Sequence, residues 1–188
     1  MGEFYEQTYN KLDFTMTSFK FGEYENCHFE ACNFAGVALT DIRFISCSFT
    51  KCDWSNAKVL NTAFQEVLFK DCKILGVHFE DCKPFLLEMD FQHCIMHYAS
   101  FYKLDLKASS FANCDLKEAD FTGANLSKLE LKNCDLLAAI FENTHLAGTD
   151  FRSAFQFQID PERNNIKKAK FAKESLLGLL GKYEILVE

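Results

Sequence analysis

The sequence predicts an all-β solenoid in which the chain turns a corner every five residues and closes a four-sided coil about every twenty residues. The main observation is a period of five. Steps of five residues from Phe4 to Phe79 meet sixteen apolar residues in succession, and after a shift of two residues the series continues from Leu86 to Phe151 with fourteen more. This period fits neither the turn of an α-helix nor the alternation of a β-strand.

A second series lies two positions before these apolar centres and holds small residues. All nine cysteines occupy this slot, and alanines fill many of its other positions. Free cysteine behaves as a small buried hydrophobe, which suits a position beside a large ring. We therefore expect both series to point inward. The nine cysteines are Cys27, Cys32, Cys47, Cys52, Cys72, Cys82, Cys94, Cys114 and Cys134.

The shift of phase lies within residues 82–87, where two residues are added and Pro84 interrupts the pattern. We expect a short loop that bulges from one corner of the coil. One interpretation is an insertion that a surface corner tolerates. The other is a small contact loop, in which Pro84 and Phe85 meet a partner.

Two neighbouring segments show the repeat most clearly: residues 119–123 read Ala-Asp-Phe-Thr-Gly, and residues 124–128 read Ala-Asn-Leu-Ser-Lys. This order of small residue, Asp or Asn, Leu or Phe and two variable residues resembles the pentapeptide repeat family, over roughly residues 2–151. The resemblance implies a right-handed quadrilateral β-helix. We expect the β-helix to occupy residues 1–171 and a C-terminal module to occupy residues 172–188.

The C-terminal module holds more apolar residues than a simple cap needs. Residues 173–182 predict a short helix, and residues 183–187 resemble a short strand. A helix of this length is unstable alone, so we expect it to cap the solenoid. The surplus apolar surface suggests that two chains also meet here. The expected interface residues are Leu176, Leu177, Leu179, Leu180, Tyr183, Ile185 and Val187.

The C-terminal residues resemble one particular group within this family. Residues 159–161 (Ile-Asp-Pro), 165–171, 176–180 and 185–188 resemble the C-terminus of the Qnr-type quinolone-resistance proteins. This resemblance implies a homodimer joined end to end through the module, and a DNA-like rod that engages DNA gyrase or topoisomerase IV. The chain departs from these relatives at residues 172–174, where they often have Ser-Leu-Pro, and in its shorter insertion at Pro84.

The predicted rod is acidic. Residues 1–151 hold 22 acidic and 13 basic side chains, whereas residues 152–188 hold five and seven. The net charge of −7 argues against nucleic-acid binding through a basic surface. The side that contains Phe4 and Tyr24 has seven acids against three bases, whereas the side that contains Tyr9 and Phe29 is balanced, with five of each. We call these seven acids the acidic stripe and expect them to bind a partner: Glu3, Glu6, Glu23, Glu25, Glu66, Glu88 and Asp105.

Eight aspartates, with Asp105 among them, precede a centre residue and also suit a second role. At such positions an Asp side chain commonly accepts a hydrogen bond from the backbone of its own turn. The glutamates of the stripe have no such local role, so we regard them as the better candidates for contact with a partner.

Sequence motifs for catalysis are missing from the chain. It has no P-loop, no GxSxG elbow and no GxGxxG fingerprint in a suitable context. The nearest group that resembles a metal site is residues 93–97, where Cys94 should point inward while His93 and His97 point outward, so that they cannot converge on zinc. We expect no enzymatic activity, no metal and no cofactor.

Two hypotheses for function follow. The first is a DNA mimic that binds a type II topoisomerase and protects it from quinolones or natural poisons. The alternative is a passive repeat scaffold that binds some other protein. The sequence shows no signal peptide and no apolar stretch that could cross a membrane, and its cysteine count is odd, so we expect a reducing cytoplasm.

Overall fold

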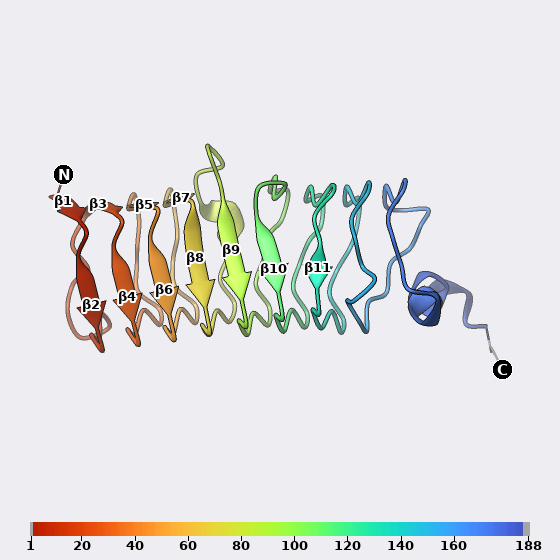
Figure 1. The fold of residues 1–188 in the computed structure, drawn as a ribbon, viewed down its shortest axis with the longest axis horizontal. Coiled ribbons are helices and arrows are strands. Elements are labelled where there is room, and N and C mark those ends of the chain that lie inside the picture. Colours follow the sequence, from red (N-terminus) through yellow and green to blue (C-terminus); the bar gives the residue numbers. More distant parts are fainter. Residues whose placement is uncertain (1, 186–188) are drawn as a thin grey trace.

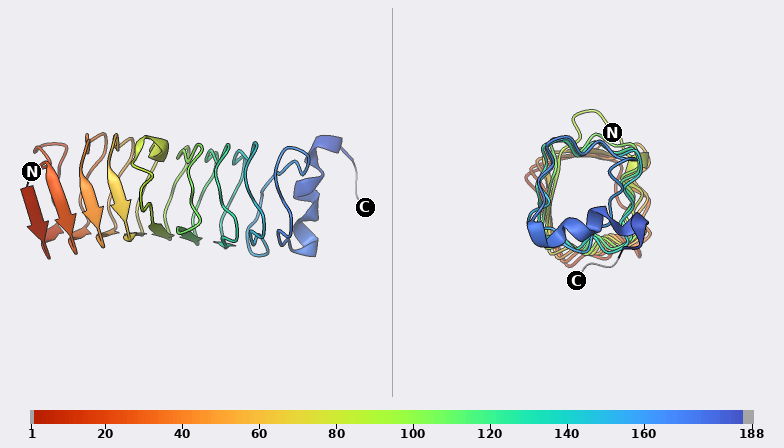
Figure 2. Two further views of the ribbon diagram at one scale, coloured as in Figure 1. Left: turned by 90° about the horizontal axis from the view of Figure 1, so that it is seen from above. Right: turned by 90° about the vertical axis from the view of Figure 1, so that its right-hand side faces the viewer.

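The computed structural model describes residues 2–185, which form a rod of stacked coils (Figure 1). Seen along the rod, the coils superpose as a square (Figure 2, right). We name the four sides in chain order, so that in the first coil side A is centred on Phe4, side B on Tyr9, side C on Phe14 and side D on Phe19. The architecture is the four-sided β-helix that the period of five predicts.

Sides A and B carry the regular strands, and all of these pair in parallel. Side A has a sheet of four strands: β1 (Gly2–Tyr5), β3 (Gly22–Glu25), β5 (Arg43–Ile45) and β7 (Ala63–Gln65). Side B has a sheet of seven strands: β2 (Thr8–Asn10), β4 (His28–Glu30), β6 (Ser48–Thr50), β8 (Val67–Lys70), β9 (Met89–Gln92), β10 (Ser110–Ala112) and β11 (Leu131–Lys132). Isolated parallel bridges join the coils elsewhere.

The pairing of β8 with β9 confirms the predicted shift of phase. Before the loop, neighbouring coils pair twenty residues apart, as Gly2 does with Gly22. Across the loop the distance grows by two residues, so that Val67 pairs with Met89 and Lys73 with Ile95. The prediction that Leu86 points inward is wrong. Leu86 is 63% exposed and has a left-handed backbone (φ 54°), while Leu87 is 5% exposed and fills the core. The added residues make a turn at Leu86, and the next apolar side chain therefore points inward.

The inward-pointing rings form continuous stacks along the rod. On side B the ring centroids of Phe69, Phe91 and Phe111 follow one another at 5.1 Å. On side D the rings of Phe101 and Phe121 lie 5.2 Å apart and nearly parallel. Aromatic pairs at such distances add to the stabilisation from burial. The core therefore joins each coil to its two neighbours along the rod.

The small slot also supplies hydrogen-bond donors. The Sγ atom of Cys47 lies 3.2 Å from the carbonyl oxygen of Tyr24 in the preceding coil, and eight of the nine cysteines make this contact. Thr149 does the same through its hydroxyl, 2.7 Å from the carbonyl oxygen of Leu126. All nine cysteines are buried and free. The slot therefore provides partners for inward-facing carbonyls, as well as space for the rings.

We expect the replacement of Thr149 by valine to lower the free energy of unfolding by about 1 kcal/mol, because valine keeps the shape but cannot donate to the buried Leu126 carbonyl. Chemical denaturation measures the change. The same replacement at the exposed Thr40 serves as a control and should have almost no effect. Equal stability of the Thr149 variant and the parent chain would contradict this role for the slot.

A short helical segment covers the C-terminal end of the rod. It consists of two 3-10 helices, η2 (Lys173–Leu179) and η3 (Gly181–Tyr183). The short helix is confirmed, but the strand predicted from Tyr183 is wrong over the described residues. Tyr183 belongs to η3, and the left-handed backbone of Glu184 (φ 49°) interrupts any extended conformation. A third 3-10 helix, η1 (Phe79–Asp81), precedes the loop.

Gly178 allows η2 to pack directly on the last coil. The Ile159 N–H donates to the Gly178 carbonyl oxygen at 2.8 Å. A Cβ atom at position 178 would lie only 2.4 Å from the carbonyl oxygen of Phe157, so only glycine fits this approach. The inward stack continues to this point, since the rings of Phe151 and Phe171 lie 5.2 Å apart.

Candidate functional site

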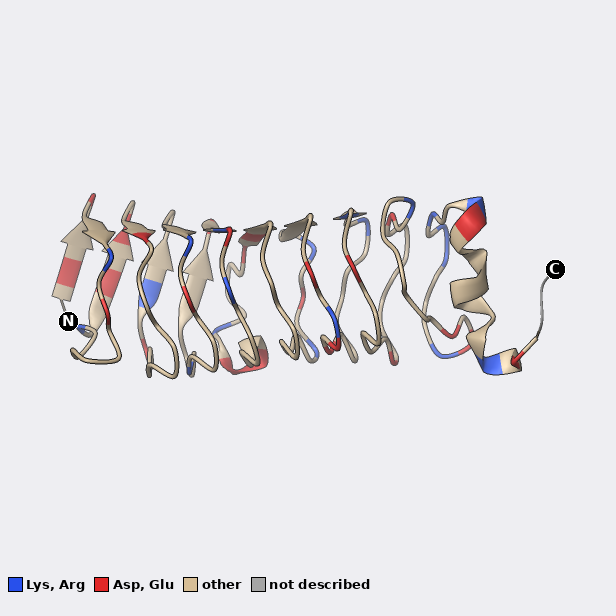
Figure 3. Ribbon diagram, turned by 90° about the horizontal axis from the view of Figure 1, so that it is seen from below, with Lys and Arg blue, Asp and Glu red and all other residues tan. Residues whose placement is uncertain are grey.

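Side A of the first coils carries acidic residues whose charge is partly neutralised. Glu3 of β1 pairs in register with Glu23 of β3, and Glu23 pairs in turn with Arg43 of β5. The guanidinium of Arg43 lies 2.7 Å from the Glu23 carboxylate. Figure 3 shows acidic positions in red and basic ones in blue along the rod. The ion pair removes much of the negative charge that Glu23 would offer to a partner.

The corner between sides A and B gathers the other glutamates of the stripe. Glu6 and Glu66 occupy this corner with left-handed backbones (φ 50° and 55°), and Glu25 ends the strand beside it. Glu88 occupies the position that corresponds to Glu66 in the next coil, because Glu66 precedes Val67, Glu88 precedes Met89, and Val67 pairs with Met89. The Glu88 carbonyl oxygen also accepts a hydrogen bond from the Val67 N–H. The stripe therefore divides into two groups. Glu3, Glu6 and Glu25 lie near the N-terminal end, and Glu66 and Glu88 lie beside the loop.

Asp105 performs the local role that its position predicts. It accepts a backbone hydrogen bond from the Lys107 N–H at 3.4 Å, and its other oxygen lies 3.0 Å from Lys107 Nζ. Seven of the eight aspartates make the same turn contact, which confirms that expectation. The exception is Asp90, which accepts a hydrogen bond from the Ser110 hydroxyl. These aspartates support the corners of the coils.

The loop of residues 83–88 projects from side A (Figure 2, right), and its tip exposes apolar side chains. Phe85 is 72% exposed, beside the exposed Leu86. A hollow on one flank is lined by Glu66, Glu88 and Leu86 among others, and a hollow on the other flank includes Pro84 and Asp105. We call residues 84–88 together with Glu66 and Asp105 the loop surface. It combines an apolar tip with carboxylates on both flanks.

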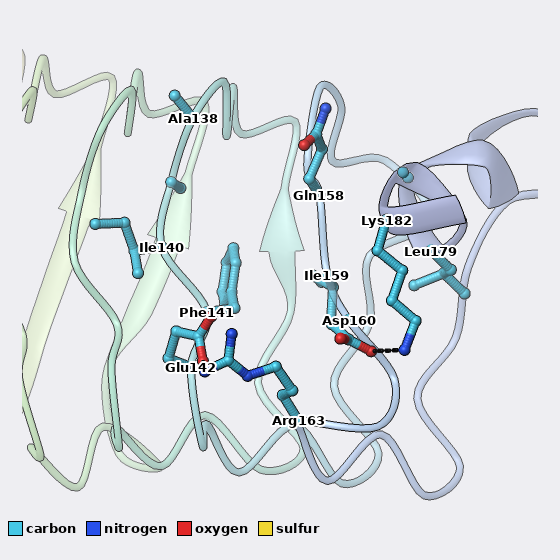
Figure 4. A pocket seen from close by; sticks show the side chains of 13 residues that line it. Ala138, Ile140, Phe141, Glu142, Gln158, Ile159, Asp160, Arg163, Leu179 and Lys182 are labelled. Carbon is cyan, nitrogen blue, oxygen red and sulfur yellow. Dashed lines mark hydrogen bonds and ion pairs between the residues drawn. The ribbon is translucent and has the colours of Figure 1, made fainter. Parts of the chain in front are cut away.

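A groove of about 420 Å³ lies between the last coils and η2 (Figure 4). Its acids are paired. Arg163 lies 2.9 Å from Glu142, and Lys182 lies 2.8 Å from Asp160. Hydrogen bonds to Asp160 and Glu162 raise the pKa of Lys182, and the bond from Lys182 lowers the pKa of Asp160. Because Lys182 lies in η3, its pair with Asp160 anchors the helical segment to the coil, whereas the pair of Arg163 with Glu142 joins two coils.

The predicted interface residues of the C-terminal module differ in exposure. Leu176, Leu177, Tyr183 and Ile185 are exposed, and Leu179 and Leu180 are half-buried, with Leu179 lining the groove. None of the residues of η2 or η3 is fully buried. The remaining predicted interface residue, Val187, lies outside the described residues.

The histidines of residues 93–97 do not converge with Cys94. Cys94 points inward and is buried, His93 is exposed, and His97 Nε2 lies 2.8 Å from Asp115. Burial pushes the pKa of Asp115 upward, but hydrogen bonds from His97 and Lys117 outweigh this effect and hold the pKa below its ordinary value. Within residues 2–185 no three His, Cys, Asp or Glu side chains are placed to hold a metal ion. The same part of the chain has no helix long and apolar enough to cross a membrane.

Comparison with known proteins identifies the family. Residues 22–88 and 86–179 each match the model of the pentapeptide repeat region. The chain belongs to the pentapeptide repeat family. None of the curated proteins compared with it matches significantly.

Comparison with solved structures gives matches of differing quality. A trypsin-treated variant of QnrB1, a plasmid-mediated fluoroquinolone resistance protein, matches with a TM-score of 0.73 at 16% identity, covering 100% of this chain and 92% of that one. A second trypsin-treated QnrB1 variant gives 0.52 at 17% identity, with 100% of both chains covered. HetL, from the cyanobacterium Nostoc, gives 0.41 at 11% identity over 90% of this chain and 84% of that one. At 16% and 17% identity the likeness to QnrB1 shows the fold alone.

Proposed function

We propose that this pentapeptide repeat protein binds a type II topoisomerase, DNA gyrase or topoisomerase IV, as a mimic of DNA. The observation that carries the proposal is the acidic rod itself, with 22 acidic and 13 basic side chains in residues 1–151. A rod of negative charge is attracted to a groove that holds DNA phosphates. By occupying this groove without chemistry of its own, the protein modulates the enzyme or protects it from quinolones or natural poisons.

The loop surface is the proposed centre of contact. Its carboxylates Glu66 and Glu88 form no ion pair within the described residues, whereas Glu23 is paired with Arg43. At the tip, the exposed ring of Phe85 is of the aromatic type that is enriched at protein interfaces, and Leu86 beside it adds apolar area for a partner to cover. The free glutamates steer the encounter, and the tip supplies the short-range contact.

Reversal of the free charges tests the contact. We expect Glu25→Lys, Glu66→Lys and Glu88→Lys together to weaken binding to gyrase by about tenfold or more at low salt. The reason is that the new positive charges repel the positively charged groove that the glutamates attract. Binding is measured by titration of labelled gyrase, with DNA as competitor. The loss should shrink as salt rises, and the thermal melting of the variant should match that of the parent.

A matched variant separates the stripe from net charge. Glu30→Lys, Glu118→Lys and Glu130→Lys change the charge by the same amount at exposed positions away from the loop surface. This control should bind gyrase nearly as well as the parent. Equal weakening in the two triple variants would show that position is irrelevant, and would exclude the stripe as the contact.

A passive repeat scaffold for another protein is the second candidate. Two acids of the stripe, Glu23 and Asp105, are neutralised by neighbouring cations, which reduces the likeness to DNA on side A. The exposed Phe85 and Leu86 would then serve a different protein surface. If this is correct, the immobilised protein does not retain gyrase. It retains another protein instead, and the strength of that binding depends little on salt concentration.

A homodimer through the C-terminal module is also proposed. The support is the group of exposed apolar side chains on η2 and η3, with Leu177 more than half exposed. Exposure of these apolar side chains does not stabilise a single chain. A two-fold interface would bury the same side chains of both copies and so remove their apolar area from water.

A further inference from the structure

Side A changes the sign of its charge along the rod. All of its glutamates lie before the loop or in it, and Arg43, the basic residue of side A before the loop, is paired with Glu23. After the loop side A holds one acid, Asp105, which is paired with Lys107. The lysines that follow are exposed and form no ion pair within the described residues: Lys128, Lys167 and Lys168. Side A therefore has an acidic half and a basic half, separated by the loop.

The corner between sides A and B gives the register of these charges. Strand pairing and bridges between coils place the corner residues in one row, with one residue from each coil. We number the coils 1 to 9 by this row, which consists of Glu6, Asn26, Ser46, Glu66, Glu88, Ala108, Lys128, Gly148 and Lys168.

The residue before each corner forms a second row on side A. Glu25 of coil 2 and Lys167 of coil 9 hold this position, because the carbonyl oxygen of each accepts a hydrogen bond from the corner N–H of the preceding coil, that of Glu6 and that of Gly148. In both rows the acids thus belong to the early coils and the free lysines to the late ones.

A second copy of side A matches this order of charges. In a two-fold contact the same surface supplies both members of every pair. A two-fold axis parallel to the strands of side A reverses the direction of the rod and keeps each row opposite itself. With the axis between coils 5 and 6, coil 4 faces coil 7 and coil 2 faces coil 9. Glu66 then faces Lys128, and Glu25 faces Lys167.

The neighbouring registers are excluded by like charges. An axis through coil 5 places Glu88 on Glu88, and an axis through coil 6 places Lys107 on Lys107. Two basic residues also face each other in the chosen register, Arg43 and His145, but the Arg43 guanidinium is neutralised by Glu23 of its own chain. Like charges in a contact are unfavourable, so the axis between coils 5 and 6 gives the complementary arrangement.

The same register provides a place for the loop. The loop belongs to coil 5, so its tip faces coil 6 of the partner. A hollow of about 380 Å³ lies on this flank of each loop and is lined by Pro84, Asp105 and Ala108 among others. Phe85 is 72% exposed. When Phe85 enters the hollow of the other copy, its apolar area leaves water, which favours the contact.

We propose that side A is a self-association surface, on which two copies lie antiparallel with the acidic half of each against the basic half of the other. Phe85 of each copy occupies the hollow beside the loop of the other. The contact spans coils 2 to 9, and about three outward residues per coil bring it within the range of about 20–30 residues a side of a standard interface. Because the paired charges are exposed, association weakens as salt rises. This proposal does not depend on the topoisomerase.

Sedimentation velocity over a series of concentrations at low salt tests this contact, with no topoisomerase present. The background chain is Leu177→Asp, which excludes association through η2. We expect Glu25→Lys with Glu66→Lys to weaken association by about tenfold or more. This double variant moves the net charge toward zero, which by itself favours association, so the expected loss reports the lost pairs. Lys128→Glu with Lys167→Glu should weaken association to a similar degree.

Exchange of all four charges in one chain restores both pairs and the net charge of the background chain. This fourfold variant should associate like the background chain, and so should an equimolar mixture of the two double variants. The matched control is Lys51→Glu with Lys70→Glu, at exposed positions on and beside side B, and it should also associate like the background chain. Thermal melting confirms that each variant is folded.

Four results would each overturn the proposal. They are a background chain that does not associate at any concentration, double variants that associate as well as it does, a fourfold variant that is as weak as the double variants, and a control that is weakened as much as the lysine double variant.

Discussion

Replacement of Phe91 by alanine is expected to lower the free energy of unfolding by about 3–5 kcal/mol. The Phe91 ring is fully buried and stacked between Phe69 and Phe111. Its edge also contacts the rings of Phe79 and Phe101. The stacked rings are held by the coils on either side, so the cavity cannot close easily. In a solenoid such a loss weakens the interfaces with both neighbouring coils.

Urea denaturation followed by the fluorescence of Trp54, the single tryptophan, measures this change. Phe4→Ala is the matched control. Phe4 lies in the first coil, is only partly buried, and stacks with Tyr24 on one side alone. We expect this control to lose less than half as much stability. Similar losses at the two positions would contradict the view that the stacks join successive coils.

Leu177→Asp is expected to convert a dimer into a folded monomer. Leu177 is 54% exposed on η2, so the substitution removes no core contact within the chain. In a two-fold interface, however, it introduces two unpaired charges into an apolar contact. Light scattering after gel filtration gives the mass, and thermal melting confirms that the variant is folded.

Leu60→Asp is the control for this experiment, because Leu60 is a leucine of similar exposure (51%) on the side of the rod. This control should keep the mass of the parent. A Leu177→Asp variant that is still a dimer at low protein concentration would place the interface elsewhere.

The fold could be predicted because it repeats. Each repeat of five residues needs one large and one small apolar side chain in the core. Because the requirement recurs along the chain, single exceptions do not obscure the pattern. The position of the phase shift followed from the same count, and the pairing of Val67 with Met89 confirms it. The errors fall where the repeat stops. The turn at Leu86 and the left-handed backbone at Glu184 are local conformations that a period cannot encode.

The candidate site could be predicted less well, because its properties depend on neighbours across coils. Glu23 and Arg43 are twenty residues apart, so the coil length predicts that they are neighbours. A count of acidic and basic residues on one side ignores such pairs and therefore overstates the free negative charge. The hydrogen bonds of the cysteines do not follow from the apolar character of the slot, because that character says nothing of the weak donor on each Sγ atom. The signal was present in Thr149, a polar residue in the same slot.

Gyrase supercoiling with the purified protein titrated in, with and without ciprofloxacin, tests the proposed function most directly. We predict that the protein restores supercoiling in the presence of the drug, and that the Glu25, Glu66 and Glu88 charge-reversal variant does not. Inhibition without restoration would confine the protein to modulation of the enzyme. No effect on supercoiling in either condition would contradict the proposal that this acidic rod acts on gyrase.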